Sequence, residues 1–167
     1  THTAYREHVF DRPQIYLPAE AIAESSMMIE APLEARLDSV VSQLNQLPRL
    51  LTQGRTLLRG PPQEWTEEAI EKTGQLSRFL DGLPAYFNKL IQTDSQRKER
   101  LERALAQAKI ALKEFKKFLV DDLMPRSHGA PAVGAEIYNK LLKLEQVPLT
   151  ADQLYKMTAS DLAELQA

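Results

Sequence analysis

The chain has 167 residues, of which 43% are hydrophobic and 26% are charged, and its formal net charge is −2. This composition excludes a disordered or collagen-like chain, and the near balance of charge gives no general attraction to nucleic acid or to an anionic membrane. The absence of cysteine excludes disulfides, iron–sulfur clusters, thiolate catalysis and cysteine-based zinc sites. No segment approaches the ~20 apolar residues that a membrane-spanning helix needs.

The first 17 residues lack a clear helical pattern. Pro13 and Pro18 restrict the residues before them to extended backbone. We therefore predict an extended arm with at most one short turn over 1–17, followed by a helical domain over 18–167.

The next segments show helical periodicity interrupted by proline. From Pro32 the apolar residues follow steps of three and four, which predicts a helix that Pro48 should kink or break. Gly60-Pro61-Pro62 marks a boundary, and Thr66 is predicted to be the N-cap of the following helix. The apolar positions of the two stripes are Leu33, Leu37, Val40, Val41, Leu44 and Leu47, then Ile70, Leu76, Phe79, Leu80, Leu83, Phe87 and Leu90.

The longest helix is predicted over residues 95–123, ending before Pro125. Leu112 and Phe115 lie in the middle of its apolar stripe and should be buried. Ile110 lies on the opposite side of this helix, which is unusual for a helix packed on one face only.

The carboxyl-terminal part is predicted as a loop over 125–133, a short helix, and a last helix preceded by the capping-box pair Thr150 and Gln153. No segment alternates as a strand would. The sequence thus predicts an all-α protein: a multi-helix bundle of about five to seven helices with one long central helix and no sheet. The start at Thr1 and the uncapped last helix lead us to expect a fragment of a larger helical protein.

The histidines give no metal or catalytic motif. None is followed by Glu, so the zinc-binding helix motif is absent, and His2 and His8 in the arm are interpreted as solvated. Ser127 and His128 are adjacent, which does not allow the usual geometry of a nucleophile and its base.

Charged clusters are also interpreted as structural. Neighbouring carboxylates on a helix diverge by about 100°, so neither of the two acidic pairs suits acid–base catalysis. Residues 97–117 hold eight basic and three acidic residues, but no exposed aromatic side chain interleaves them as a nucleic-acid site would need. We therefore predict no catalytic, cofactor-binding or metal-binding residue and no nucleic-acid partner. The side chains considered are Glu67, Glu68, Asp121, Asp122, Lys109, Lys113, Lys116 and Lys117.

Three blocks of sequence resemble a bacterial family known as domain of unknown function 885, and the resemblance extends over about residues 11–165. The blocks are Leu47-Pro48-Arg49-Leu50-Leu51 with Gly60-Pro61-Pro62-Gln63-Glu64-Trp65-Thr66, then Phe118-Leu119 to Leu123-Met124-Pro125-Arg126, then Val133-Gly134-Ala135-Glu136-Ile137-Tyr138 through Leu149-Thr150-Ala151-Asp152-Gln153-Leu154.

Members of that family resemble helical zinc metallopeptidases, whose metal signature is a His-Glu pair followed by a second His. That signature lies downstream of the matched blocks, so no catalytic or metal residue is transferred to this chain. The resemblance implies a non-catalytic, amino-side helical portion of a peptidase-like protein, forming a wall or lid of a substrate channel. Zinc is implied only for a full-length parent, and the expected partners are the rest of that parent, a peptide substrate in the parent, or a second copy of the chain.

The alternative is a free-standing helical module that binds a protein partner and has no enzymatic role. A reading frame that continues past Ala167 to a His-Glu pair would favour the peptidase-like interpretation. A stop codon near Ala167 would favour the module.

Overall fold

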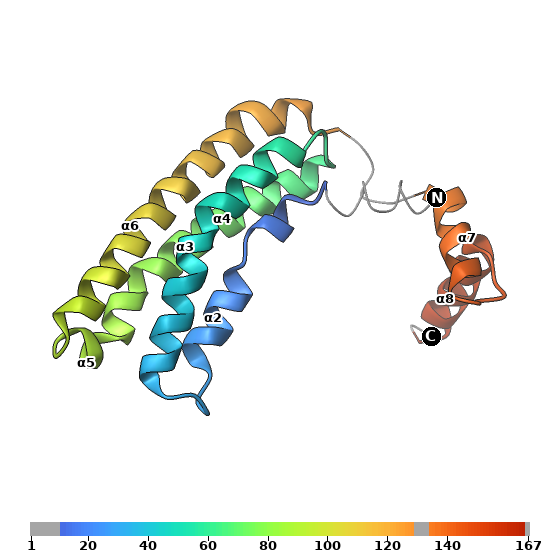
Figure 1. The fold of residues 1–167 in the computed structure, drawn as a ribbon. Coiled ribbons are helices and arrows are strands. Elements are labelled where there is room, and N and C mark those ends of the chain that lie inside the picture. The colour runs from blue at the N-terminus through green and yellow to red at the C-terminus, as the bar shows by residue number, and fades with distance from the viewer. Residues whose placement is uncertain (1–10, 129–133, 166–167) are drawn as a thin grey trace. The chain divides into compact units, whose positions relative to one another are not determined.

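The computed structural model describes residues 11–128 and 134–165, and in these ranges it contains helices and no strand (Figure 1). Contacts divide the chain into two compact units, one holding residues 11–128 and the other holding the last two helices. The all-α fold class is confirmed. The sequence predicted one helical domain over 18–167, and the division near residue 129 was not predicted. His2 and His8, interpreted from the sequence as solvated, lie outside the described residues.

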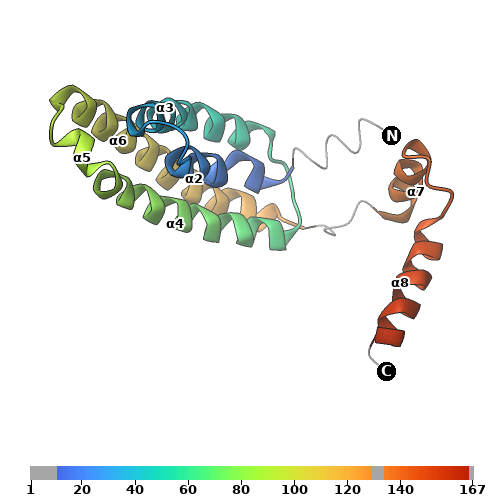
Figure 2. The same cartoon turned by 90° about the horizontal axis from the view of Figure 1, so that it is seen from below.

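The first unit is a helical bundle. Its elements are the 3-10 helix η1 (Pro13–Tyr16), α2 (Ala19–Met27), α3 (Leu33–Leu57), α4 (Gln63–Tyr86), the short α5 (Asn88–Ile91), α6 (Ser95–Phe118), the π-helical turn η2 (Leu119–Leu123) and the 3-10 turn η3 (Met124–Arg126). Helix α6 packs on α3 and α4, while α2 packs on α3 (Figures 1 and 2). The core lies between the three long helices, where the predicted apolar stripes meet.

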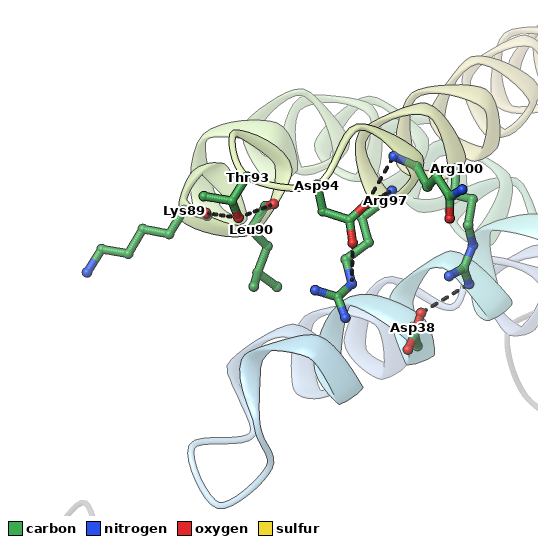
Figure 3. Close-up of polar contacts among 8 residues, drawn as sticks. Asp38, Lys89, Leu90, Thr93, Asp94, Arg97 and Arg100 are labelled. Carbon is green, nitrogen blue, oxygen red and sulfur yellow. Dashed lines mark hydrogen bonds and ion pairs between the residues drawn. The ribbon is translucent and has the colours of Figure 1, made fainter.

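Helix α6 confirms the main prediction for the long helix. Asp94 caps it by accepting hydrogen bonds from the backbone N–H groups of Gln96 and Arg97 at 3.0 and 3.1 Å (Figure 3). Leu112 and Phe115 are buried, whereas Ile110 is 61% exposed. The last turn up to Leu123, η2, is a π-helix, and the 3-10 helix η3 follows it directly. Helical backbone therefore continues through Pro125 to Arg126, which the predicted end at Leu123 and the predicted loop from residue 125 did not include.

Pro48 does not break its helix, which was one of the two outcomes predicted for it, and the predicted N-cap Thr66 is wrong. Helix α3 continues through Pro48, because Leu44, Leu47 and Leu51 on either side of it are buried and their packing outweighs the one backbone hydrogen bond that proline removes. Helix α4 begins at Gln63, so Thr66 is not its N-cap.

The 3-10 helix η1 is a single short turn, as the prediction for the arm allowed. Tyr16 and Leu17 are buried members of the core, and η1 contacts both α3 and α4. Because two large side chains are anchored, the end of the predicted arm is part of the bundle. Its first ten residues lie outside the described part.

The second unit is a helical hairpin of α7 (Gly134–Leu144) and α8 (Ala151–Leu165). Gln153 accepts a hydrogen bond from the backbone N–H of Thr150 at 2.8 Å, and the Thr150 hydroxyl accepts one from the N–H of Gln153 at 3.3 Å. The predicted capping box is therefore confirmed.

Candidate functional site

A groove of about 630 Å³ lies in the first unit between α4 on one side and η1 with α2 on the other. Its volume falls in the range of small-molecule and peptide sites. Apolar side chains form much of its lining, and a row of polar side chains follows one wall. The lining residues are Arg12, Gln14, Ile15, Leu17, Ala19, Glu20, Ala23, Trp65, Glu68, Lys72, Gln75, Leu76 and Phe79.

An arginine and an aromatic ring meet at this groove. The guanidinium carbon of Arg12 lies over the Trp65 ring, 4.4 Å from its centroid. This distance is within the range of cation–π attraction, so the ring restricts the arginine to one region of the groove. Trp65 is the one tryptophan of the sequence, which makes its fluorescence a specific probe of this site.

The amide of Gln14 orders the polar wall. Its Nε2 donates to the backbone carbonyl of Trp65 at 3.0 Å and to the carboxylate of Glu68 at 2.7 Å. Since both of these groups can only accept, the amide has one orientation. Gln14 therefore ties η1 to the first two turns of α4.

Glu68 is the centre of the charges on this wall. Its carboxylate pairs with the ammonium of Lys72 at 2.9 Å, one helical turn further along α4. The hydrogen bond from Lys72 lowers the pKa of Glu68 most, with further contributions from Gln14 and from the charges of Lys72 and Arg12. The carboxylate is therefore ionised at neutral pH.

Tyr16 packs η1, which forms part of one side of the groove, against α3. Its side chain is 4% exposed and lies against Gly54 of α3. Burial, together with the negative charge of Asp11, raises the pKa of the Tyr16 hydroxyl. Asp11 also accepts a hydrogen bond from the backbone N–H of Arg59 at 2.8 Å, which fixes the start of this segment.

The structure gives Ser127 a structural environment. Its hydroxyl is buried, donates to the carbonyl of Leu123 at 2.9 Å, and lies 2.6 Å from the hydroxyl of Thr66. Since Ser127 has one proton to donate, Thr66 must be the donor in their shared bond. His128 is exposed, and Asp122 pairs with Arg126 at 3.4 Å. These residues are not brought together as a catalytic triad.

The lysines of α6 are exposed except for the half-buried Lys109. Lys98 pairs with Glu102 on the same helix, and Lys109 pairs with another helix of the bundle. Lys109 forms an ion pair with Asp81 of α4 at 2.5 Å. Lys117 lines a shallow depression of about 450 Å³ that also contains Arg55, Phe118, Glu114, Asp121 and Asp122. Acidic side chains are thus interspersed with the cations, which weakens any attraction to a polyanion.

Neither a group of potential metal ligands nor a helix able to span a membrane occurs among the described residues. Within 11–128 and 134–165, no three His, Asp or Glu side chains are grouped so that they could hold a metal ion. None of the helices in this part of the chain combines the length and hydrophobicity required to cross a membrane.

The groove is not predictable from local sequence. Glu68 stands out in the sequence only as a carboxylate near a helix start, and Arg12 and Gln14 fall in the predicted arm. No local pattern links residues 12 and 14 to residue 65, because they meet through the packing of η1 on α4. The isolated Trp65 beside Gly60-Pro61-Pro62 was the one available signal.

Comparisons with known proteins place the chain in a family. The model of the family described as "Bacterial protein of unknown function (DUF885)" matches residues 3–167. Searches of curated proteins and of solved structures gave no match. Since the match extends over nearly the whole chain, this protein belongs to the DUF885 family of bacterial proteins.

Proposed function

We propose that this chain is a non-catalytic helical portion of a peptidase-like protein, and that its groove forms part of a wall or lid that binds the peptide substrate. The proposal assigns hydrolysis, and any zinc, to residues of the parent protein outside this chain. It combines the resemblance of the family to helical metallopeptidases with the groove of the first unit.

The groove is the observation that supports a peptide ligand. Its apolar floor offers a surface to side chains, and the ordered wall of Gln14, Glu68 and Lys72 offers hydrogen-bond partners to a peptide backbone. Apolar surface with a few fixed polar groups is typical of sites that bind small organic ligands. The wall is already held in place by Gln14, so binding requires little ordering of the protein.

The test is a titration of the protein with a decapeptide of alternating Ala and Leu residues that is blocked at both ends. Binding is measured by calorimetry, and a change in Trp65 fluorescence shows that the peptide lies in the groove. The variant Ile15→Asp places a charge on the groove lining and should abolish binding. Its matched control is Leu57→Asp, because Leu57 is 50% exposed, compared with 43% for Ile15, and lies outside the groove.

The peptide-binding role is rejected if the blocked decapeptide does not bind the wild-type protein, or if Ile15→Asp and Leu57→Asp affect binding equally. Circular dichroism of both variants checks that each is folded.

A second candidate is the free-standing interaction module, which the helical hairpin favours. Tyr155, Leu162 and Leu165 of α8 are 74%, 56% and 86% exposed. Exposed apolar side chains on one small unit are typical of a surface that another protein covers. The fragment interpretation instead predicts self-association through this surface, with a sedimentation coefficient that rises with concentration and no longer rises in Leu162→Glu. The variant Ile110→Glu tests α6 in the same way. A strictly monomeric chain, unaffected by either change, would count against the fragment and favour the self-contained module.

A further inference from the structure

The guanidinium of Arg12 is available to a ligand. The side chain is exposed and lies over Trp65, and among residues 11–128 and 134–165 it has no hydrogen-bond acceptor and no carboxylate within ion-pair distance. Lys72, the other cation of the groove, is instead paired with Glu68. Arg12 is therefore the cation of the groove whose N–H groups are not already used within the described structure.

The chemistry of this group favours a carboxylate. A guanidinium has its donors in one plane, and two of them match the two oxygens of a carboxylate. Because the Trp65 ring restricts Arg12, less side-chain entropy is lost when it binds an anion. Glu20 and Glu68 also line the groove, and their negative charges disfavour a polyanion.

The lining of the groove next to Arg12 determines which chemical group of the ligand can lie beside its carboxylate. Ile15, three residues after Arg12, and the Trp65 ring under Arg12 line this part of the groove and offer an apolar surface. Leu76 and Phe79 line the groove three to four turns further along α4. A ligand with one carboxylate next to an apolar group thus fits both features. The peptide terminus is favoured over a fatty acid because of two groups in the same groove that can bond a peptide backbone but not an alkyl chain. They are Gln14 Oε1, which accepts no hydrogen bond within the described residues, and the protons of Lys72 that do not reach Glu68.

We propose that Arg12 binds the terminal carboxylate of a peptide whose last, apolar side chain enters the groove beside Trp65. The inference rests on the peptide-binding role proposed above and adds the polarity of the ligand: its carboxyl end lies at Arg12. It also makes the carboxylate, rather than the internal sequence, the main determinant of affinity.

The experiment compares two tetrapeptides, acetyl-Ala-Ala-Ala-Leu with a free carboxylate and the same peptide with a terminal amide. Binding is measured by calorimetry, and Trp65 fluorescence reports the location. The free acid should bind about tenfold or more tightly than the amide, as expected for a charge-assisted pair. Raising the salt concentration should reduce this preference.

The variant Arg12→Gln should remove the preference for the acid, so that the acid and the amide bind this variant with equal affinity. Arg12→Lys should restore part of the preference, since the charge returns without the paired donors. The matched control is Arg49→Gln, because Arg49 is an exposed arginine on α3 outside the groove and should keep the full preference.

Four outcomes would overturn this inference. If the acid and the amide bind the wild-type protein equally, Arg12 does not recognise the terminal carboxylate. The peptide-binding role still stands in that case, provided that the blocked decapeptide binds. A preference that persists in Arg12→Gln assigns the carboxylate to another residue. Tighter binding of decanoate than of the peptide acid identifies a fatty acid as the source of the carboxylate. If neither tetrapeptide nor the decapeptide binds, both proposals fall.

Discussion

The ring of Tyr16 lies so close to Gly54 that a Cβ atom on residue 54 would be 2.8 Å from Cγ of the ring. Atoms of this kind do not approach within 3 Å without displacement, and the ring is held by the core around it. Gly54 is in the interior of α3, where glycine is unfavourable for a helix. This close contact lets η1 pack on α3 and brings Arg12 and Gln14 to the groove.

We expect Gly54→Ala to destabilise the protein by about 1 to 3 kcal/mol, the usual cost of overpacking, despite the better helix propensity of alanine. The matched control is Gly82→Ala in α4, where no atom lies within 4 Å of the added methyl group. That change should stabilise the protein by about 0.5 to 1 kcal/mol. Urea denaturation of both variants measures the difference, and the same sign for both would contradict the prediction. In a Tyr16→Ala background the cost of Gly54→Ala should disappear.

The buried hydroxyl pair of Thr66 and Ser127 should behave as one coupled unit. Thr66→Val keeps the shape of the side chain but removes its hydroxyl, and Ser127→Ala removes the other hydroxyl. Each should cost about 1 kcal/mol, because a buried polar partner is lost. The double variant should cost less than the sum of the two, which a double-mutant cycle measures. Strict additivity would show that the two hydroxyls do not interact.

Leu112→Ala should destabilise the protein by about 2 to 5 kcal/mol, the range for truncating a large buried side chain. The reason is its burial, since Leu112 is 1% exposed in the middle of α6. Ile110→Ala on the opposite face should cost no more than about 0.5 kcal/mol, as expected for a surface position. Thermal denaturation of the two variants provides the comparison, and equal midpoints would be inconsistent with the packing of α6.

The carboxylate of Glu68 should make a pH-dependent contribution to stability. Its pKa is lowered from 4.5 in the folded protein, so its contribution is present above pH 4.5 and is lost as the pH falls through the folded pKa. Glu68 is about half exposed, and a contribution of about 0.2 to 1 kcal/mol is typical of such pairs. Glu68→Gln should therefore be less stable than wild type at pH 7 and equally stable at pH 2. A difference that stays constant with pH would contradict this role.

The sequence by itself determined the helices and their buried faces. The stripe of α6 was predictable from spacing alone, because residues three and four apart share one face of a helix regardless of what covers it. The capping box at Thr150 is equally local, since groups of neighbouring residues form it. The family was recognisable for the same reason, as its blocks lie at helix boundaries.

Tertiary structure decided which local rules were overridden and where the groove lies. Pro48 predicts a kink or a break, but the buried leucines around it keep α3 continuous. Threonine is a favoured N-cap residue, yet the hydroxyl of Thr66 pairs with Ser127, which is 61 residues away in the sequence. One site contains Arg12, Gln14 and Trp65. It forms because the Tyr16 ring packs against Gly54, which has no Cβ atom to keep the ring away. Contacts between residues so far apart depend on the shape of the packed core, and the local periodicity of a sequence does not encode that shape.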